Sequence, residues 1–333
     1  MRGVDLAQFQ FDYDLKWAAV LLNADGTVYA RYGSGSADGD MALQSVAGLR
    51  RTLERVLEAH AAYPDNRARF VGKRGPAPQY RRAEEIPSPK IRKLLAASDA
   101  RQSCIHCHNV YDGRHDVLAG RDDYDPRKLF KHPMPENLGL VVDSTDGTVI
   151  EQVRPGSPAA VAHIRPGDRL DSIDGQAILS LADIQFALHF SGEEASVEVR
   201  VLREADGKST THSTTMRLEP GWRESDISWR ASMWNLPPGP GFWTEALDAS
   251  AKSRLGIEAD RAALLVRGVW HPVPKQAGVA KGDVIVAIDG QNEAVSGPEF
   301  AAHIRLNCYR SGSRLELTLL RDGKRQSRTL VYP

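Results

Sequence analysis

The sequence predicts an α+β protein in which an α/β segment is followed by two β-rich domains that are related to each other. Two observations lead to this prediction. Short motifs recur at a nearly constant offset in the second half of the chain, and a strand–turn–strand–helix pattern occupies the first 66 residues. The length of 333 residues is enough for two or three domains with separate cores.

Composition and charge exclude several classes of protein. The chain holds 43 basic and 43 acidic residues, so no overall field favours nucleic acid or another polyanion. No run approaches the roughly 18 to 20 apolar residues that a membrane-spanning helix needs. The first five residues lack the apolar stretch of a signal peptide. We find no nucleophile elbow and no acid–base constellation, so we predict no catalytic residues.

The first 66 residues show the α/β pattern. An apolar run from Trp17 to Leu22 ends in the turn sequence Asn23-Ala24-Asp25-Gly26, and alternation from Thr27 to Tyr32 indicates a second strand. Apolar residues at helical spacing predict a helix over 42–62, which Pro64 ends. Residues 67–100 are rich in Arg, Lys and Pro, and we expect an extended linker there.

A cysteine–histidine motif follows this linker. Cys104-Ile105-His106-Cys107-His108 has the spacing of a covalent haem c site, in which both thiols bind the haem vinyl groups and His108 binds the iron. For the sixth ligand we favour Met134, which two prolines hold in extended backbone, with His115 and His132 as alternatives.

Two other chemistries compete for these cysteines. Zinc would take Cys104, Cys107 and two of the three histidines His108, His115 and His132. A redox disulfide would make the chain a thiol–disulfide oxidoreductase. We expect the third cysteine, Cys308, to be a small buried apolar side chain.

The second half of the chain contains an internal repeat. Gly167-Asp168 and Gly282-Asp283 lie 115 residues apart, and so do Asp174-Gly175 and Asp289-Gly290. The triplets Leu138-Gly139-Leu140 and Leu255-Gly256-Ile257 precede them at an offset of 117 residues. Two motifs at one offset indicate two copies of one domain.

These residues resemble PDZ domains of the bacterial periplasmic-protease type. The resemblance implies that Leu138, Gly139 and Leu140, and likewise Leu255, Gly256 and Ile257, form loops that bind a peptide's terminal carboxylate. Helices near 181–190 and 298–306 would form the other wall of each groove. The implied partners are protein or peptide C-termini. A PDZ-like domain can instead dock on a neighbouring domain and bind no free peptide.

The whole order resembles bacterial proteins that join a thioredoxin-like domain to tandem PDZ domains. Residues 1–66 resemble the second half of a thioredoxin-like domain, and an upstream C-x-x-C is absent from this chain. This departure from the family pattern argues against oxidoreductase activity in this chain. It also implies a native upstream segment with a signal peptide and a periplasmic or other extracytoplasmic location, where haem c is attached.

We therefore predict five regions and one scaffold function. The regions are a partial thioredoxin-like segment (1–66), a linker with the haem or metal motif (67–135), a first PDZ-like domain (136–220), a Trp-rich linker (221–239) and a second PDZ-like domain (240–333). The predicted function is protein binding through PDZ grooves, with a covalent haem for electron transfer or redox sensing and a redox partner to match. The alternative is a PDZ interaction protein with structural zinc or unmodified thiols.

Overall fold

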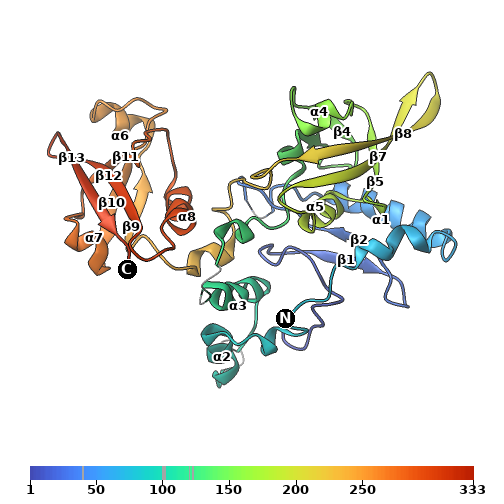
Figure 1. The fold of residues 1–333 in the computed structure, drawn as a ribbon, viewed down its shortest axis with the longest axis horizontal. Coiled ribbons are helices and arrows are strands. Elements are labelled where there is room, and N and C mark those ends of the chain that lie inside the picture. The colour runs from blue at the N-terminus through green and yellow to red at the C-terminus, as the bar shows by residue number, and fades with distance from the viewer. Residues whose placement is uncertain (40, 100–102, 120, 122–123) are drawn as a thin grey trace. The chain divides into compact units, whose positions relative to one another are not determined.

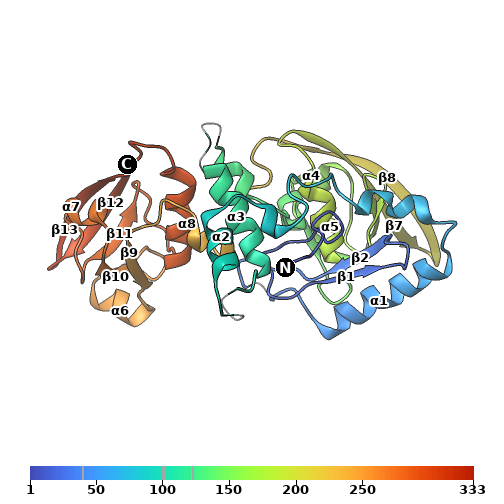
Figure 2. The same ribbon diagram turned by 90° about the horizontal axis from the view of Figure 1, so that it is seen from below.

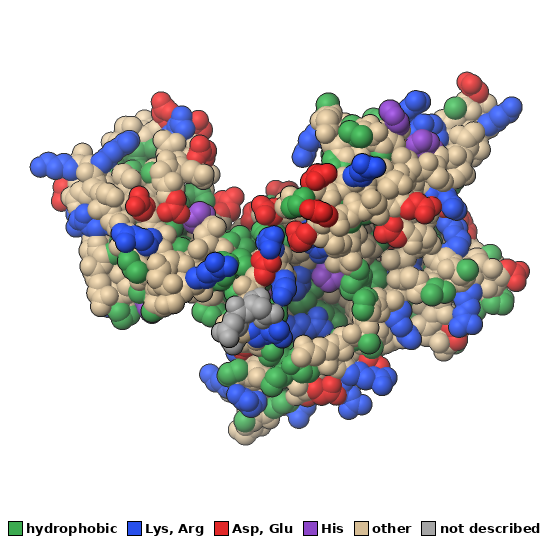
Figure 3. Space-filling model, in the orientation of Figure 1, with side chains coloured by type: hydrophobic (Ala, Val, Ile, Leu, Met, Phe, Trp, Pro, Cys, Tyr) green, Lys and Arg blue, Asp and Glu red, His purple; other side chains and the backbone are tan. Residues whose placement is uncertain are grey.

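The computed structural model describes residues 1–39, 41–99, 103–119, 121 and 124–333, which form two compact units (Figure 1). Unit 1 comprises Met1–Arg121 and Lys128–Asp226, and unit 2 comprises Asp122–Arg127 and Ile227–Pro333. Residues 100–102, 120, 122 and 123 of the predicted linker lie outside the described residues. Lys and Arg side chains are interspersed with Asp and Glu on the face drawn in Figure 3. None of the described helices is long and apolar enough to cross a membrane.

The N-terminal segment forms a hairpin and a helix, in the expected order. Strands β1 (Ala19–Leu22) and β2 (Val28–Tyr32) are antiparallel, and α1 (Val46–Ala61) follows. The α1 helix begins later than predicted because Ser45 caps it by accepting a hydrogen bond from the Gly48 N–H. The thioredoxin-like interpretation of this segment stays a prediction.

Short helices occupy the stretch 67–100, where we expected an extended linker, and the segment that follows it. These are η1 (Arg67–Lys73), η2 (Ala83–Glu85), α2 (Pro89–Ala96), α3 (Cys107–Ala119), η3 (Pro126–Leu129) and η4 (Pro135–Leu138). Ile86 and Ile91 are buried together with Leu6, Tyr13 and Tyr111 in a small separate core. The apolar residues are too sparse to show a period, but Ala83, Ile86 and Ile91 pack against N-terminal residues and α3.

The first PDZ-like domain completes unit 1. Its elements are β3 (Leu140–Val142), β4 (Ile150–Val153), α4 (Pro158–Val161), β5 (Arg169–Ile173), β6 (Gln176–Ala177), α5 (Leu181–His189), β7 (Ala195–Ala205) and β8 (Lys208–Leu218). A sheet in the order β6-β5-β7-β8 and the pair β3-β4 enclose a core into which α5 packs. Trp222, from the Trp-rich segment, joins this core.

Unit 2 contains the second PDZ-like domain. Its elements are η5 (Ala231–Asn235), β9 (Phe242–Ala246), α6 (Ala249–Arg254), β10 (Leu264–Val269), α7 (Pro272–Gln276), β11 (Val284–Ile288), α8 (Gly297–Asn307), β12 (Arg314–Arg321) and β13 (Lys324–Val331). The sheet order β13-β12-β11-β10-β9 leaves β9 at an edge.

The repeated Gly-Asp pairs have one structural role in both copies. Asp168 accepts hydrogen bonds from the Arg203 guanidinium at 2.7 Å and from the Arg165 N–H at 2.8 Å. Asp283 accepts from the Arg321 guanidinium at 2.6 Å and from the Ala280 N–H at 2.8 Å. Each carboxylate is buried and ties the turn before its strand to the long hairpin that ends the domain.

Candidate functional site

In the first copy the expected carboxylate-binding loop leads directly into β3. Gly139 has a φ of +83°, and its carbonyl accepts a hydrogen bond from the Arg154 N–H at 2.8 Å. A Cβ at this position would overlap the side chain of Ser157, the residue that caps α4. Glycine is therefore required both by the positive φ and by the close approach of the α4 cap.

The same arrangement occurs in the second copy at Gly241. This residue has a φ of +76°, and its carbonyl accepts from the N–H groups of Trp270 at 3.1 Å and His271 at 3.0 Å. A Cβ at Gly241 would lie 2.5 Å from the Cβ of His271, which caps α7. Gly241 thus occupies in the second copy the position that Gly139 occupies in the first.

This equivalence corrects the second loop that the sequence suggested. Leu255, Gly256 and Ile257 follow the end of α6, which is inserted between β9 and β10. A Cβ at Gly256 would meet no atom within 4 Å. The first copy has no helix at the corresponding place, between β3 and β4, among its described residues. With α6 inserted, the residue of the second copy that is structurally equivalent to Gly139 lies upstream of the predicted triplet, at Gly241.

The groove helix α5 of the first copy is contacted by the chain's own N-terminal segment. Strand β2 lies beside α5 in both ribbon views (Figures 1 and 2). The hydroxyl of Ser180, which caps α5, donates a hydrogen bond to the Arg31 carbonyl. The Arg31 N–H in turn donates to Asp183 Oδ1 at 3.1 Å. A backbone segment is thus bound at the start of α5.

A buried ion pair reinforces this contact. Lys73 Nζ lies 2.6 Å from Asp183 Oδ2, and the two side chains are 0% and 1% exposed. Burial lowers the pKa of Lys73 to about 8, and the Asp183 charge opposes that effect. The Arg31 guanidinium lies 3.4 Å from the centre of the Phe186 ring. Sequence reasoning missed this cluster because its members are far apart in the chain.

Two residues beyond Asp183 in α5, Gln185 binds two more segments. Its side-chain N–H group donates to the His132 carbonyl at 3.2 Å and to Met134 Sδ at 2.9 Å. Its carbonyl oxygen accepts a hydrogen bond from the Ser34 hydroxyl. Leu43 packs against the core cluster of the first PDZ-like domain. Gln185 thus ties α5 to the segment after β2 and to the segment before η4.

The second copy differs, because α8 packs on its own edge strand β9. At Gly297, the first residue of α8, a Cβ would lie 3.0 Å from the Thr244 carbonyl oxygen, so a glycine permits the close approach. Trp243 in β9 and Trp270 after β10 are 64% and 61% exposed, and both adjoin Gly241. The loop of the second copy is thus bordered by two large apolar side chains in contact with solvent.

The cysteine–histidine motif lies where α3 begins. Cys104 is exposed and Cys107 is half-buried. His108 Nδ1 lies 3.3 Å from Asp112 Oδ2, and this hydrogen bond raises the pKa of His108. Burial raises the pKa of the Cys107 thiol, which is opposite to the shift that activates redox cysteines. Cys308 is 2% exposed, and burial raises its pKa to about 11.

The other proposed ligands make contacts of their own in unit 1. Met134 Sδ accepts a hydrogen bond from Gln185, and His132 stacks on His189 with ring centres 4.2 Å apart. His115 is buried beside Tyr111, and its Nε2 lies 2.8 Å from Lys131 Nζ. No group of three or more His, Cys, Asp or Glu residues in the described part of the chain is placed to hold a metal. The haem and zinc assignments of the motif both stay predictions.

Comparison with known proteins supports the PDZ assignment. A PDZ domain model matches residues 149–203. A probable periplasmic serine protease do/HhoA-like from Haemophilus influenzae is 29% identical over 195 residues, which are 59% of this chain and 36% of that protein. A probable periplasmic serine endoprotease DegP-like from Marinomonas is 25% identical over 190 residues, 57% of this chain and 38% of that protein. This chain thus spans little more than a third of the length of either relative.

Two further matches are more limited. Serine protease HTRA1 from Xenopus tropicalis is 32% identical over 117 residues, which are 34% of this chain and 24% of that protein. The solved structure of the HtrA-type protease AlgW with a decapeptide is 16% identical, has a TM-score of 0.24, and covers 41% of this chain and 48% of that one.

The loops, the sheets and the family match define a PDZ-domain-containing protein. Its PDZ portion is related to that of the HtrA and DegP periplasmic proteases.

The equivalence of Gly139 and Gly241 predicts unequal costs for two alanine substitutions. Gly241 and Gly256 both have a positive φ, so alanine costs about 1 kcal/mol at either one. At Gly241 the added methyl group also meets His271, so Gly241→Ala is expected to cost about 1–3 kcal/mol more. Urea unfolding of the two variants measures the difference, and equal losses would show that Gly241 is not the tightly packed loop glycine.

Proposed function

We propose that this chain is an extracytoplasmic PDZ scaffold whose first copy docks the chain's own N-terminal segment and whose second copy binds partner proteins. This division of roles between the two copies is supported most directly by the contacts that Arg31, Ser34 and Lys73 make with α5. The location follows from the relatives, which are described as periplasmic proteases. The partner class, protein or peptide C-termini, follows from the PDZ fold.

The first copy supports the docking part of the proposal. A free peptide would have to lie along α5, where Gln185 already binds Ser34 and His132. Displacing the N-terminal segment would also expose the Lys73–Asp183 pair, which is buried and within 3 Å. Breaking such a pair is costly because each buried charge loses its partner. External ligands are therefore disfavoured at this groove.

The second copy supports the partner-binding part. Strand β9 lies at the edge of its sheet, and an edge strand can pair with an added peptide strand. Trp243 and Trp270 stand exposed beside Gly241, and tryptophan often dominates the energy of interfaces. Opening of the α8–β9 contact at Gly297 would admit the peptide's terminal residues. We propose peptides that end in an apolar residue.

This assignment predicts which tryptophan controls ligand binding. Peptides with a free C-terminus are selected from a random display library on the whole chain, and their Kd values are measured by fluorescence polarisation. Trp243→Ala is expected to weaken binding roughly tenfold or more, because it removes an apolar anchor. Trp17→Ala, at a 44% exposed tryptophan of unit 1, serves as the control and should leave Kd unchanged.

Two outcomes would contradict the division of roles between the copies. One is selected peptides whose affinity falls with Asp183→Asn in the first copy but not with Trp243→Ala. The other is unchanged affinity when the C-terminal carboxylate of the selected peptide is amidated.

A second candidate function concerns the cysteine–histidine motif, where we propose covalent haem c at Cys104, Cys107 and His108. The supporting observation is the hydrogen bond between His108 Nδ1 and Asp112, since a carboxylate commonly orients an axial histidine through its other ring nitrogen. Among the described residues His108 Nε2 makes no hydrogen bond. Bound haem would supply one-electron transfer, and these three residues would hold it.

The haem proposal predicts a stain that depends on one cysteine and not on another. The chain is exported behind a signal peptide in a host that matures cytochromes c, then examined by absorption spectroscopy and by haem staining of a denaturing gel. Covalent attachment predicts a stain that Cys104→Ala abolishes and that Cys308→Ala, at the buried third cysteine, leaves intact. An unstained wild-type chain would reject the proposal, and metal analysis of that sample tests zinc.

A further inference from the structure

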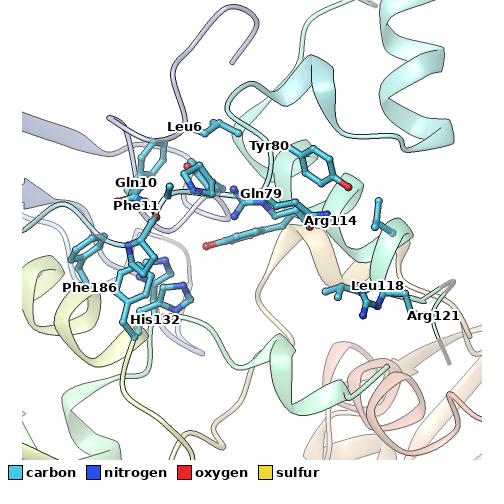
Figure 4. A pocket seen from close by; sticks show the side chains of 18 residues that line it. Leu6, Gln10, Phe11, Gln79, Tyr80, Arg114, Leu118, Arg121, His132 and Phe186 are labelled. Carbon is cyan, nitrogen blue, oxygen red and sulfur yellow. Dashed lines mark hydrogen bonds between the residues drawn. The ribbon is translucent and has the colours of Figure 1, made fainter. Parts of the chain in front are cut away.

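Unit 1 contains a cavity of about 300 Å³ that neither PDZ groove explains (Figure 4). Its walls come from residues 6–13, the segment Pro76–Tyr80, the outer part of α3, and His132 with the end of α5. Only the α5 residues of this wall fall within the span that matches the PDZ model. The volume is at the lower end of the range for small-molecule sites in proteins, roughly 300–1,000 Å³.

Aromatic rings form a large part of the cavity wall. Phe11 and Tyr13 pack edge to face with ring centres 4.7 Å apart, and Tyr13 and Tyr111 do so at 5.1 Å. Such stacking fixes the rings against one another, so the wall keeps its shape without a ligand. Tyr80 and Phe186 add further aromatic surface. A ligand with a flat apolar body would fit this lining better than a strongly hydrated ligand.

The charged side chains of the lining all have one sign. Arg114 and Arg121 line the cavity together with His132 and His189, and no Asp or Glu is among the described residues that line it. Arginine stays protonated at every physiological pH. Arg114 therefore places a positive charge at the cavity wall, and a ligand with a negative group would complement it.

Arg114 is the best placed of these cations. Figure 4 shows its side chain reaching from α3 into the group of lining residues. It is half-buried, its guanidinium lies 5.5 Å from the centre of the Tyr13 ring, and it forms no ion pair with a carboxylate in the described part of the chain.

Tyr13 does not neutralise this cation. Burial raises the pKa of Tyr13 to about 12, so the phenol stays neutral at physiological pH, and its hydroxyl donates to the Phe9 carbonyl. The planar donor groups of Arg114 thus remain suited to a carboxylate or sulfonate.

From the volume, the aromatic wall and the Arg114 guanidinium, which pairs with no carboxylate among the described residues, we propose that this cavity binds a small organic anion with a flat apolar body. Arg114 would bind the anionic group, and the rings of Phe11, Tyr13 and Tyr111 would pack against the apolar part. This site lies outside the proposed partner-binding surface at β9, so the two proposals can fail independently.

The test compares two probes that differ by one sulfonate group and therefore in charge. One is 1-anilinonaphthalene-8-sulfonate, and the other is N-phenyl-1-naphthylamine, its neutral parent. Both are titrated into the whole chain and followed by fluorescence, with circular dichroism to confirm that the fold is native. The wild-type chain should bind the sulfonate about tenfold more tightly than the neutral probe, because only the sulfonate can pair with Arg114.

Variants locate the binding within the molecule. Arg114→Gln should remove the preference for the sulfonate and leave the neutral probe's affinity within about twofold. Arg92→Gln, at an exposed arginine of α2, is the matched control and should change neither affinity. Leu118→Trp, which fills the cavity, should weaken both probes about tenfold or more.

Several results would overturn the inference: no binding of either probe, equal affinities in the wild-type chain, or a preference that survives Arg114→Gln. If Arg114→Gln fails to fold, Leu118→Trp tests whether the probes bind in the cavity. Unchanged binding of both probes by that variant would reject the site. Arg114→Lys adds a further check, because it keeps the charge and should retain part of the preference.

Discussion

The buried ion pair between Lys73 and Asp183 is the contact on which the arrangement of unit 1 depends. It joins the segment after α1 to the groove helix of the first PDZ copy, and both side chains are excluded from solvent. Asp183 also accepts the N–H groups of Arg31 and Leu179, each at 3.1 Å. One carboxylate thus holds three separate stretches of chain. Removing either partner of the ion pair would leave an uncompensated buried charge, at a cost of about 3–5 kcal/mol.

This constraint supports the different roles that we propose for the two copies of one fold. In the first copy the groove helix α5 faces β2, and its polar side chains bind backbone and side-chain groups of the same chain. In the second copy Gly297 lets α8 pack on β9, and the exposed tryptophans adjoin the loop glycine. The first copy therefore organises unit 1, and the edge strand of the second is the surface that we assign to partners. The anion cavity arises from the same docking, because its wall combines N-terminal residues with the end of α5.

The features predictable from sequence are those encoded by local chemistry. The Gly-Asp pairs were recognisable because each turn needs its own glycine and carboxylate, and the hairpin and α1 followed from periodicity and from turn residues. Gly241 was missed because α6 is inserted before β10. The sequence Leu255-Gly256-Ile257, which follows α6, has the same residue pattern as Leu138-Gly139-Leu140 in the first copy. The available signal was that the two triplets lie 117 residues apart, whereas the Gly-Asp and Asp-Gly pairs lie 115 residues apart. The pairing of Lys73 with Asp183 and the enclosure of Arg114 depend on tertiary packing, which no local pattern reveals.

Hydrogen exchange followed by mass spectrometry tests the docking of the N-terminal segment most directly. The account predicts that peptides covering β2 exchange as slowly as those covering the core strand β7. Asp183→Asn should accelerate exchange in β2 by about tenfold or more, because it weakens the ion pair and the Arg31 hydrogen bond together. Peptides covering β12 in unit 2 should be unaffected. Rapid exchange of β2 in the wild-type chain, or protection that Asp183→Asn leaves unchanged, would contradict the account.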